Sequence, residues 1–394
     1  MSDAIVFVAF QSGAQANGGL ESLTHILRAL PSRRIVVTQR ESRFTKLWRE
    51  LGCEVELIDV PEPRYVGGLA LARYRLARFP QLAAANSTVA RLVRQSGARV
   101  VHCNDSVAMW YACIGARLAG ARVLFNIRDT LGVRGPRWRA LRQLSSVVVV
   151  LSDEMKHAVE TELRDMVPLA DTAPVERIYS AVDLGKMSPP SEEERRAVRA
   201  RLGLDRESFT VVYTGTFNDK KNQLGFIEEA VPDLVRSGVA VVFVGDYQPE
   251  SEPYARRCED AIERLGLKGR VKLVGFTSTP EDWYRAADVV CLASRSEGLA
   301  RAMIESLGCG TPVVSFDVSS AREILVEGEC GLVEKQGDYA GLVAAIQSLQ
   351  NDAALRQRYG ENGARLARRL FEPAASVAAY AETYRRLGAS LTTS

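Results

Sequence analysis

Histidine and closely spaced cysteines are scarce in this chain. The 394 residues include three histidines, and none of them lies at ligand spacing from a cysteine pair. The seven cysteines are odd in number and scattered, without a C-x-x-C pair. Because structural zinc sites need such clusters, we exclude one here. Unpaired cysteines in apolar segments indicate buried, reduced thiols and favour a cytoplasmic protein.

Long apolar runs are also absent from the sequence. No run reaches the roughly 18 residues that a transmembrane helix requires. The N-terminal segment MSDAIVFVAF lacks a basic leader, so we interpret it as a first strand rather than a signal peptide. A hydrophobic content of 46% with 25% charged residues is typical of a globular protein, and 394 residues suffice for two domains.

Acidic residues are missing from one basic stretch, residues 64–104. Leu69, Ala72, Leu76 and Phe79 fall within it at helical spacing, which predicts a basic amphipathic helix. Such a helix suits an anionic membrane surface or an anionic acceptor, and a solvated helix packed on its own sheet is an equal alternative. No nucleic-acid module accompanies the stretch, so we expect no nucleic acid partner. Its arginines are Arg64, Arg73, Arg75, Arg78, Arg91, Arg94 and Arg99.

Short apolar runs alternate with segments of helical periodicity along the chain. Residues 4–10, 209–214 and 289–292 are runs expected for strands buried on both faces. The alternation predicts an α/β protein with doubly wound parallel sheets. Prolines and the charged run SEEERRAVRARLG indicate a linker and an exposed helix near residue 190. We therefore place a first domain at 1–184 and a second at 185–373.

Two glutamates, Glu297 and Glu305, stand out after the apolar run 289–292. The first lies in a polar turn, and the second lies in a helix expected to begin at Leu299. We place Glu305 about 11–12 Å further along the helix axis, which is too far for a shared proton but suits the two ends of one ligand. The alternative is an ordinary N-terminal carboxylate and a solvated helix residue. The apolar neighbours of Glu305 argue against solvation.

The helix start between these glutamates is a candidate anion site. The amide groups of Gly298, Leu299 and Ala300 would lack helical partners there, and the helix dipole is positive at that end. A ligand with phosphate in the middle and hydroxyl groups at both ends would match this arrangement. A sugar nucleotide is such a ligand.

The segment resembles the E-x7-E signature of retaining glycosyltransferases of the GT-B fold, the family 4 group. The resemblance implies two Rossmann-like domains that face a cleft, the first for the acceptor and the second for the nucleotide sugar. It also implies that a terminal helix, within residues 374–394, packs back on the first domain. Further matching residues are Gly298, Gly310, Pro312, Val313, Val314, Glu323, Gly328 and Gly331.

The resemblance implies roles for the second domain. Glu297 would hold hydroxyl groups of the transferred sugar, Glu305 the ribose, and Lys221 the leaving diphosphate. Gly215 matches the same loop as Lys221, whereas Thr216 stands where the family commonly has arginine. The missing charge would be supplied by neighbouring cations. The candidate cations are Lys220, Arg295 and Arg301. The backbone at Phe276 would meet the nucleotide base.

The first domain also carries implied site residues. Gly18 and Gly19 open a helix after the first strand, at a turn that faces the cleft in the family. His102 ends a strand and is a second-rank catalytic candidate, since such a residue is more often structural. Arg128 stands where many relatives have a histidine. An arginine there suits a phosphate or an acidic acceptor but cannot serve as a base.

The implied reaction is the retaining transfer of a sugar from a nucleotide diphosphate, such as a UDP or GDP sugar, to a glycan or lipid-linked acceptor. No Asp-x-Asp motif is present, so we expect no metal and no cofactor besides the donor. We expect a cytoplasmic enzyme of surface polysaccharide or lipopolysaccharide assembly, in peripheral contact with the membrane. The alternatives are a sugar-nucleotide epimerase, a phosphorylase and a non-catalytic binding scaffold. A dehydrogenase is disfavoured because no G-x-G-x-x-G follows the first strand.

Overall fold

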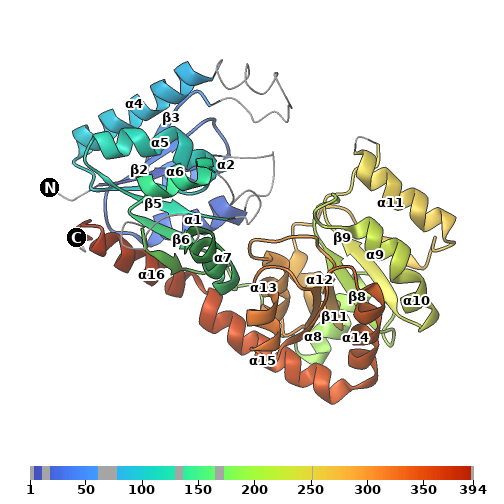
Figure 1. The fold of residues 1–394 in the computed structure, drawn as a ribbon. Helices are drawn as coiled ribbons and strands as arrows, with labels where there is room; N and C mark the ends of the chain where they lie inside the picture. Colours follow the sequence, from blue (N-terminus) through green and yellow to red (C-terminus); the bar gives the residue numbers. More distant parts are fainter. Residues whose placement is uncertain are drawn as a thin grey trace. The chain divides into compact units, whose positions relative to one another are not determined.

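The computed structural model describes residues 4–10, 18–60, 78–128, 136–164, 173–250 and 252–391. The chain forms two compact units, one of Met1–Ala181 with Pro373–Ser394 and one of Val182–Glu372 (Figure 1). The α/β class and the two parallel sheets predicted from the apolar runs are confirmed.

The described part of the first unit contains a parallel sheet in the order β3-β2-β1-β4-β5-β6-β7. The reversal of strand order on either side of β1 is the doubly wound pattern, which brings the carboxyl ends of all strands to one edge. The strands are β1 (Ile5–Val8), β2 (Arg34–Thr38), β3 (Glu54–Leu57), β4 (Val100–Cys103), β5 (Arg122–Asn126), β6 (Val147–Val150) and β7 (Val175–Arg177). Its helices are α1 (Gly18–Ala29), α2 (Arg43–Glu50), α4 (Phe79–Ser96), α5 (Ser106–Leu118), α6 (Pro136–Leu144), α7 (Asp153–Arg164) and α16 (Pro373–Arg386).

The C-terminal helix α16 belongs to the first unit. Its Tyr380 and Tyr384 are fully buried in the same apolar cluster as Phe7 of β1 and residues of α1. The predicted return of the terminal segment to the N-terminal part is therefore a feature of this fold. Two aromatic rings buried from a distant part of the sequence tie the end of the chain to the sheet.

The second unit contains a parallel sheet in the order β10-β9-β8-β11-β12-β13. Its strands are β8 (Thr210–Thr214), β9 (Ala240–Val244), β10 (Val271–Leu273), β11 (Val289–Leu292), β12 (Val313–Phe316) and β13 (Gly331–Glu334). Its helices are α8 (Glu192–Arg201), α9 (Gln223–Glu229), α10 (Val231–Arg236), α11 (Pro253–Arg264), α12 (Pro280–Ala286), α13 (Arg301–Gly308), the π-helical η2 (Arg322–Val326), α14 (Tyr339–Asn351) and α15 (Ala353–Phe371). The central strands β8, β9 and β11 are buried valine-rich runs, as a sheet covered on both faces requires.

The boundary between the units lies three residues earlier than predicted. The amide of Val182 donates to the carbonyl of Phe371 at 2.9 Å, and the Leu184 side chain packs beside Gly308. Both residues are thus anchored in the second unit, although the sequence placed them in the first domain. The prolines at 189 and 190 lie within the second unit rather than at its border.

Helix α4 begins at Phe79, the last of the apolar positions that predicted a basic amphipathic helix. Pro80 at its first turn fits a helix start, and Gly97 in the left-handed conformation ends it. Of the basic stretch, residues 61–77 lie outside the described part of the chain, including Arg64, Arg73 and Arg75. Arg91 pairs with Glu56 at 2.7 Å, which fits the interpretation of a helix packed on its own sheet at this position.

Candidate functional site

The loop after β11 and helix α13 form the centre of the site. The helix begins at Arg301, with Ala300 as its N-cap, rather than at Leu299. Glu305 therefore lies about one turn inside the helix, and the estimate of 11–12 Å along one axis was wrong because Glu297 lies in the extended loop. The amides that lack helical partners are those at the start of α13, from Arg301, rather than those of Gly298 and Leu299.

Lys221 and Glu297 form a close ion pair. Lys221 Nζ lies 2.6 Å from Glu297 Oε1, and the two side chains are 23% and 7% exposed. The lysine ends the loop after β8 and the glutamate follows β11, so the pair joins two adjacent strands at the carboxyl edge of the sheet. Because an ammonium group has three donors, Lys221 can hold Glu297 and still bind an anion.

The loop that carries Lys221 is fixed by its neighbours. Asn222 adopts a left-handed conformation with φ 58°, and its side-chain amide donates to the carbonyl of Ala293 at 2.9 Å. Asparagine tolerates this conformation, which explains why it can stand where the family has glycine. A Cβ on Gly215 would lie 3.3 Å from Lys221 Cδ, so glycine lets the lysine stem lie across the backbone. Tyr213 O–H donates to the carbonyl of Lys221.

Glu305 is held by two side chains that sequence reasoning did not connect to it. Tyr284 O–H donates to Glu305 Oε2 at 3.1 Å, and Arg301 Nη2 donates to Oε1 at 3.1 Å. The carboxylate is only 13% exposed, which confirms the expected lack of solvation. Arg301 was a candidate for the diphosphate, but here it orients Glu305. Tyr284 lies on α12, and no local sequence pattern marked it.

Three glycines end adjacent strands at the same edge. The amide of Gly215 donates to the carbonyl of Val244, and the amide of Gly245 donates to the carbonyl of Gly275, each at 2.9 Å. A Cβ on Gly245 would lie 2.1 Å from the Gly215 carbonyl oxygen, so only glycine fits. The glycines thus let the Lys221 stem and the loops after β8 and β9 approach closely, whereas the space beside Gly275 is open. Phe276 follows it and is 63% exposed.

The remaining predicted residues of the second unit lie around this edge. Thr216 is exposed, and its carbonyl accepts a hydrogen bond from Gln223 Nε2 at 3.0 Å. The amide of Arg295 donates to the carbonyl of Lys220 at 2.8 Å, which joins the two candidate cations through the backbone. The Arg295 residue is exposed. Both cations therefore flank the Lys221–Glu297 pair.

His102 is not placed for catalysis. It lies on the central strand β4, is 0% exposed and stacks on the Tyr380 ring of α16 with a centroid distance of 5.4 Å. Its Nδ1 is 2.7 Å from the Tyr384 hydroxyl oxygen. Burial, with a contribution from Arg128, lowers the pKa of His102 to about 3. The prediction of a catalytic role was wrong because α16 covers this face of the sheet.

Arg128 lies at the carboxyl edge of the first unit, after β5. Its Nε donates to the Asn104 carbonyl at 3.0 Å, its Nη2 to Asn104 Oδ1 at 2.8 Å and its Nη1 to Ser180 Oγ at 3.1 Å. Gly18 and Gly19 begin α1 at the same edge, and Ser22 of that helix accepts a hydrogen bond from the Ala181 amide at 3.1 Å. Arg128 and the start of α1 are therefore joined through consecutive residues.

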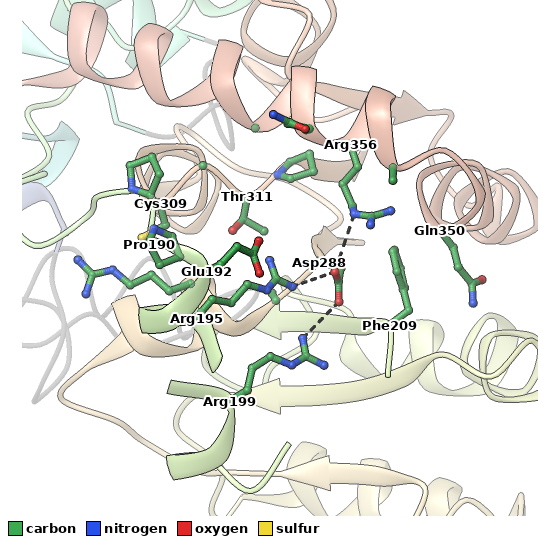
Figure 2. A pocket seen from close by; sticks show the side chains of 18 of the residues that line it. Pro190, Glu192, Arg195, Arg199, Phe209, Asp288, Cys309, Thr311, Gln350 and Arg356 are labelled. Atoms are coloured by element: carbon green, nitrogen blue, oxygen red, sulfur yellow. Dashed lines mark hydrogen bonds and ion pairs between the residues drawn. The ribbon is translucent and has the colours of Figure 1, made fainter. Parts of the chain in front are cut away.

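A cavity of about 1060 Å³ opens at the opposite, amino edge of the second sheet. Figure 2 shows Arg195, Arg199 and Arg356 directed toward Asp288, with distances of 2.8, 3.4 and 3.8 Å to its carboxylate oxygens. The Thr210 amide also donates to this carboxylate at 2.9 Å. The cluster ties α8 and α15 to the starts of β8 and β11. It is separated from the glutamates by the length of the strands, so we assign it a structural role.

No group of three or more His, Cys, Asp or Glu side chains able to hold a metal ion occurs among the described residues. Within the same residues, no helix is long and apolar enough to cross a membrane. The seven cysteines are free and buried, as predicted. Burial raises the pKa of several thiols, that of Cys309 to about 12. They are packing residues, since a thiol with a raised pKa is a poor nucleophile.

Comparison with known proteins identifies the family. The model of glycosyl transferases group 1 matches residues 194–366, and that of glycosyltransferase family 4 matches residues 21–186. The chain belongs to the GT-B glycosyltransferases. The two models together account for both units, which agrees with the resemblance stated from the E-x7-E segment.

Individual relatives have low sequence identity to this chain but match most of its length. The glycosyltransferase EpsD of Bacillus subtilis (strain 168) is 25% identical over 86% of this chain and 91% of its own. Alpha-D-kanosaminyltransferase of Streptomyces kanamyceticus is 27% identical over 76% and 80%. The structure of Anabaena HepE with UDP superposes with a TM-score of 0.80 at 22% identity, covering 98% and 100% of the two chains, and its UDP-glucose complex gives 0.77 at 21%, covering 97% and 99%. At this identity the structural likeness establishes the GT-B fold.

Proposed function

We propose that this glycosyltransferase moves a sugar from a nucleotide-diphosphate sugar to a glycan or lipid-linked acceptor, with retention of the anomeric configuration. The observation that carries the proposal is the Lys221–Glu297 pair at 2.6 Å beside the start of α13. A half-buried cation and a helix N-terminus lie there on one edge of the sheet. This edge is where ligands bind in open α/β sheets.

The cationic groups would stabilise the leaving diphosphate. Lys221 has donors left after its bond to Glu297, and the first amides of α13 add the positive end of the helix dipole. Charge that develops as the donor bond breaks would thus meet preorganised donors, the type of interaction worth about 3–4 kcal/mol per donor in other enzymes. Arg295 and Lys220 flank the pair and would offset the absence of arginine at Thr216.

The two glutamates would hold the neutral parts of the donor. Glu297 would accept hydrogen bonds from sugar hydroxyl groups at the carboxylate lone pairs that its bond to Lys221 leaves available. Glu305, oriented by Tyr284 and Arg301, has acceptor capacity left for the two ribose hydroxyl groups. The open space beside Gly275 would leave room for the nucleotide base, and exposed Phe276 follows it. The UDP complexes of HepE support UDP sugars as the first donors to test.

The reaction would proceed on one face of the sugar. The bond from C1 to the diphosphate oxygen breaks with its electron pair moving to the diphosphate, and the acceptor oxygen forms a bond to C1 on the same face. The acceptor proton passes to the leaving phosphate oxygen. The protein would contribute positioning and charge stabilisation, without metal. We find no side chain at the pair that replaces His102 as a base.

The acceptor would belong to surface polysaccharide or glycoconjugate assembly at the cytoplasmic face of the membrane. Support comes from the basic stretch that continues into α4 and past its end, where Arg94 and Arg99, respectively, are exposed. Reversal of both charges to Glu should weaken binding to vesicles of 30% anionic lipid at least severalfold, since each basic residue contributes about 1 kcal/mol near such a surface. Unchanged binding would remove the membrane from the proposal.

The donor assignment is tested by calorimetry with UDP, GDP and ADP on wild type and Glu305→Ala. We expect one nucleotide to bind, with affinity reduced about tenfold or more in the variant because a ribose-binding carboxylate is lost. The matching sugar nucleotide should then be hydrolysed slowly without acceptor, releasing the sugar with its anomeric configuration retained. Binding without hydrolysis or transfer would favour a non-catalytic scaffold.

A further inference from the structure

Arg128 carries a charge that its neighbours do not neutralise. Its partners are the carbonyl and side-chain oxygens of Asn104 and the hydroxyl of Ser180, all of which are neutral. Among the described residues, no carboxylate forms an ion pair with it. A guanidinium has five N–H groups, so Nη1 and Nη2 each keep one N–H beyond these hydrogen bonds.

Asp105 is the acidic residue whose charge acts on Arg128, and its carboxylate already has a hydrogen-bond donor of its own. Asp105 attracts the guanidinium through space, but its Oδ1 caps α5 by accepting the Ala108 amide at 2.8 Å. Burial raises the pKa of Asp105 and lowers that of Arg128. Both shifts have the direction expected of charges withdrawn from water without a close partner. Such an arginine contributes little to the stability of the fold, since an uncompensated charge is costly to bury.

Arg128 lies at the edge of the sheet where ligands bind in open α/β folds. Asn104, Arg128 and Ser180 follow β4, β5 and β7, so they meet at the carboxyl edge of the sheet. The hydrogen bond between Ser22 and Ala181 brings the first turn of α1 to the same place. The unused N–H groups and the positive end of a 12-residue helix thus act on one edge. Arg128 is partly accessible there, as a ligand-binding group must be.

We propose that Arg128, held by Asn104 and Ser180, binds a carboxylate or phosphate carried by the sugar substrate in the first unit. The inference rests on the proposed function for the identity of the ligand as a glycosyltransferase substrate. The fork of the guanidinium matches both anions with two parallel hydrogen bonds. The natural substrate is therefore acidic, and a uronate and a sugar phosphate are the two sources of the charge.

Binding of isolated anions tests this site without requiring turnover. The probes are D-glucuronate and sn-glycerol 3-phosphate, with D-glucose and glycerol as their neutral counterparts, followed by saturation-transfer NMR. Wild type should bind at least one anion and neither neutral compound. Arg128→Gln should weaken that binding tenfold or more, whereas Arg117→Gln, which removes an exposed arginine at the end of α5, should leave it unchanged. Equal binding by wild type and Arg128→Gln, or no anion binding by wild type, would overturn the inference.

Two further variants separate ligand binding from a structural role. Arg128→Lys keeps the charge but loses the fork, and we expect anion binding weakened severalfold rather than abolished. Arg128→Gln should unfold within a few degrees of wild type, since it removes an uncompensated charge. If Arg128→Gln does not fold, Arg128→Lys carries the test, and anion binding equal to that of wild type would then contradict a role for the fork.

Competition between substrates assigns the source of the charge. Among acceptors, a uronide against its neutral glycoside tests the carboxylate, and a glycosyl phosphate against the same glycoside tests the phosphate. The charged member of one pair should be favoured at least tenfold in kcat/KM, and the preference should disappear in Arg128→Gln. Equal use of both members in both pairs would contradict the inference. Failure of UDP to bind, or its insensitivity to Glu305→Ala, would instead contradict the proposed donor site.

Discussion

Lys221 Nζ lies 2.6 Å from Glu297 Oε1 although 76 residues separate them in the sequence. Each residue lies in the loop after a different central strand, and hydrogen bonds that join the Asn222 and Tyr213 side chains to the Ala293 backbone keep the two loops together. The Lys221 ammonium group has donors left for a ligand after its bond to Glu297, so the pair can bind a ligand as well as join the two loops. Loss of either partner should therefore affect the reaction more than the fold.

The first prediction concerns Lys221. Lys221→Met should lower kcat by about two to three orders of magnitude, because a cation that meets the developing diphosphate charge is removed. KM should change less, which a full saturation curve would reveal. Lys268→Met is a matched control on an exposed loop of the same unit. A fall in activity of similar size in both variants would contradict a specific role for Lys221.

Tyr284 should act through Glu305. Tyr284→Phe removes the hydroxyl that donates to Glu305 Oε2 and leaves the packing of the buried ring intact. We expect nucleotide affinity to fall a few-fold, corresponding to about 1 kcal/mol for one hydrogen bond, with kcat nearly unchanged. Calorimetry with the preferred nucleotide gives the first quantity and initial rates give the second. An unchanged dissociation constant would show that Tyr284 does not position the carboxylate.

Asp288 should matter for stability and not for donor binding. Asp288→Asn leaves Arg199, which is 4% exposed, and the neighbouring arginines without their shared carboxylate. Breaking a buried charge cluster on one side costs about 3–5 kcal/mol, which we expect as a loss in the free energy of unfolding in urea. Nucleotide affinity of the folded variant should match wild type because the cluster lies at the amino edge. A large change in affinity with normal stability would argue against this assignment.

Burial of His102 should make the first unit sensitive to acid. Its pKa is about 3 in the folded protein, against an ordinary value of 6.5, so the unfolded chain binds the extra proton between these pH values. The free energy of unfolding should therefore fall as pH decreases from 6.5 toward 3 and level off below that. The total loss from this residue is several kcal/mol at about 1.4 kcal/mol for each unit of pKa.

Comparison of variants isolates this contribution from those of the carboxyl groups. His102→Gln should show a weaker dependence of stability on pH between 6.5 and 4 than wild type, measured by urea unfolding at each pH. His157→Gln changes an exposed histidine of α7 and is the matched control. Parallel pH curves for wild type and His102→Gln would show that His102 is not held in its neutral form.

The sequence by itself determined the architecture of the protein. Buried strands such as Val289–Leu292 and amphipathic helices such as α1 are encoded by local periodicity, so their type was predictable and only their ends moved. Glu297 and Glu305 stood out beside a predicted strand and helix, whereas Lys221 was implied by the resemblance to the family. The low exposure of Glu305 was predictable from its apolar neighbours in the sequence.

Only the tertiary structure decided which side chains meet. His102 seemed available at a strand end, yet Tyr384, 282 residues away, covers it. Tyr284 and Arg301 orient Glu305, and Asn104 and Ser180 hold Arg128 at the carboxyl edge of the first sheet. These contacts depend on how helices pack over a sheet, which no local pattern encodes. Periodicity specifies the face of an element that is buried, whereas the partner on that face is set by the packing of the whole unit.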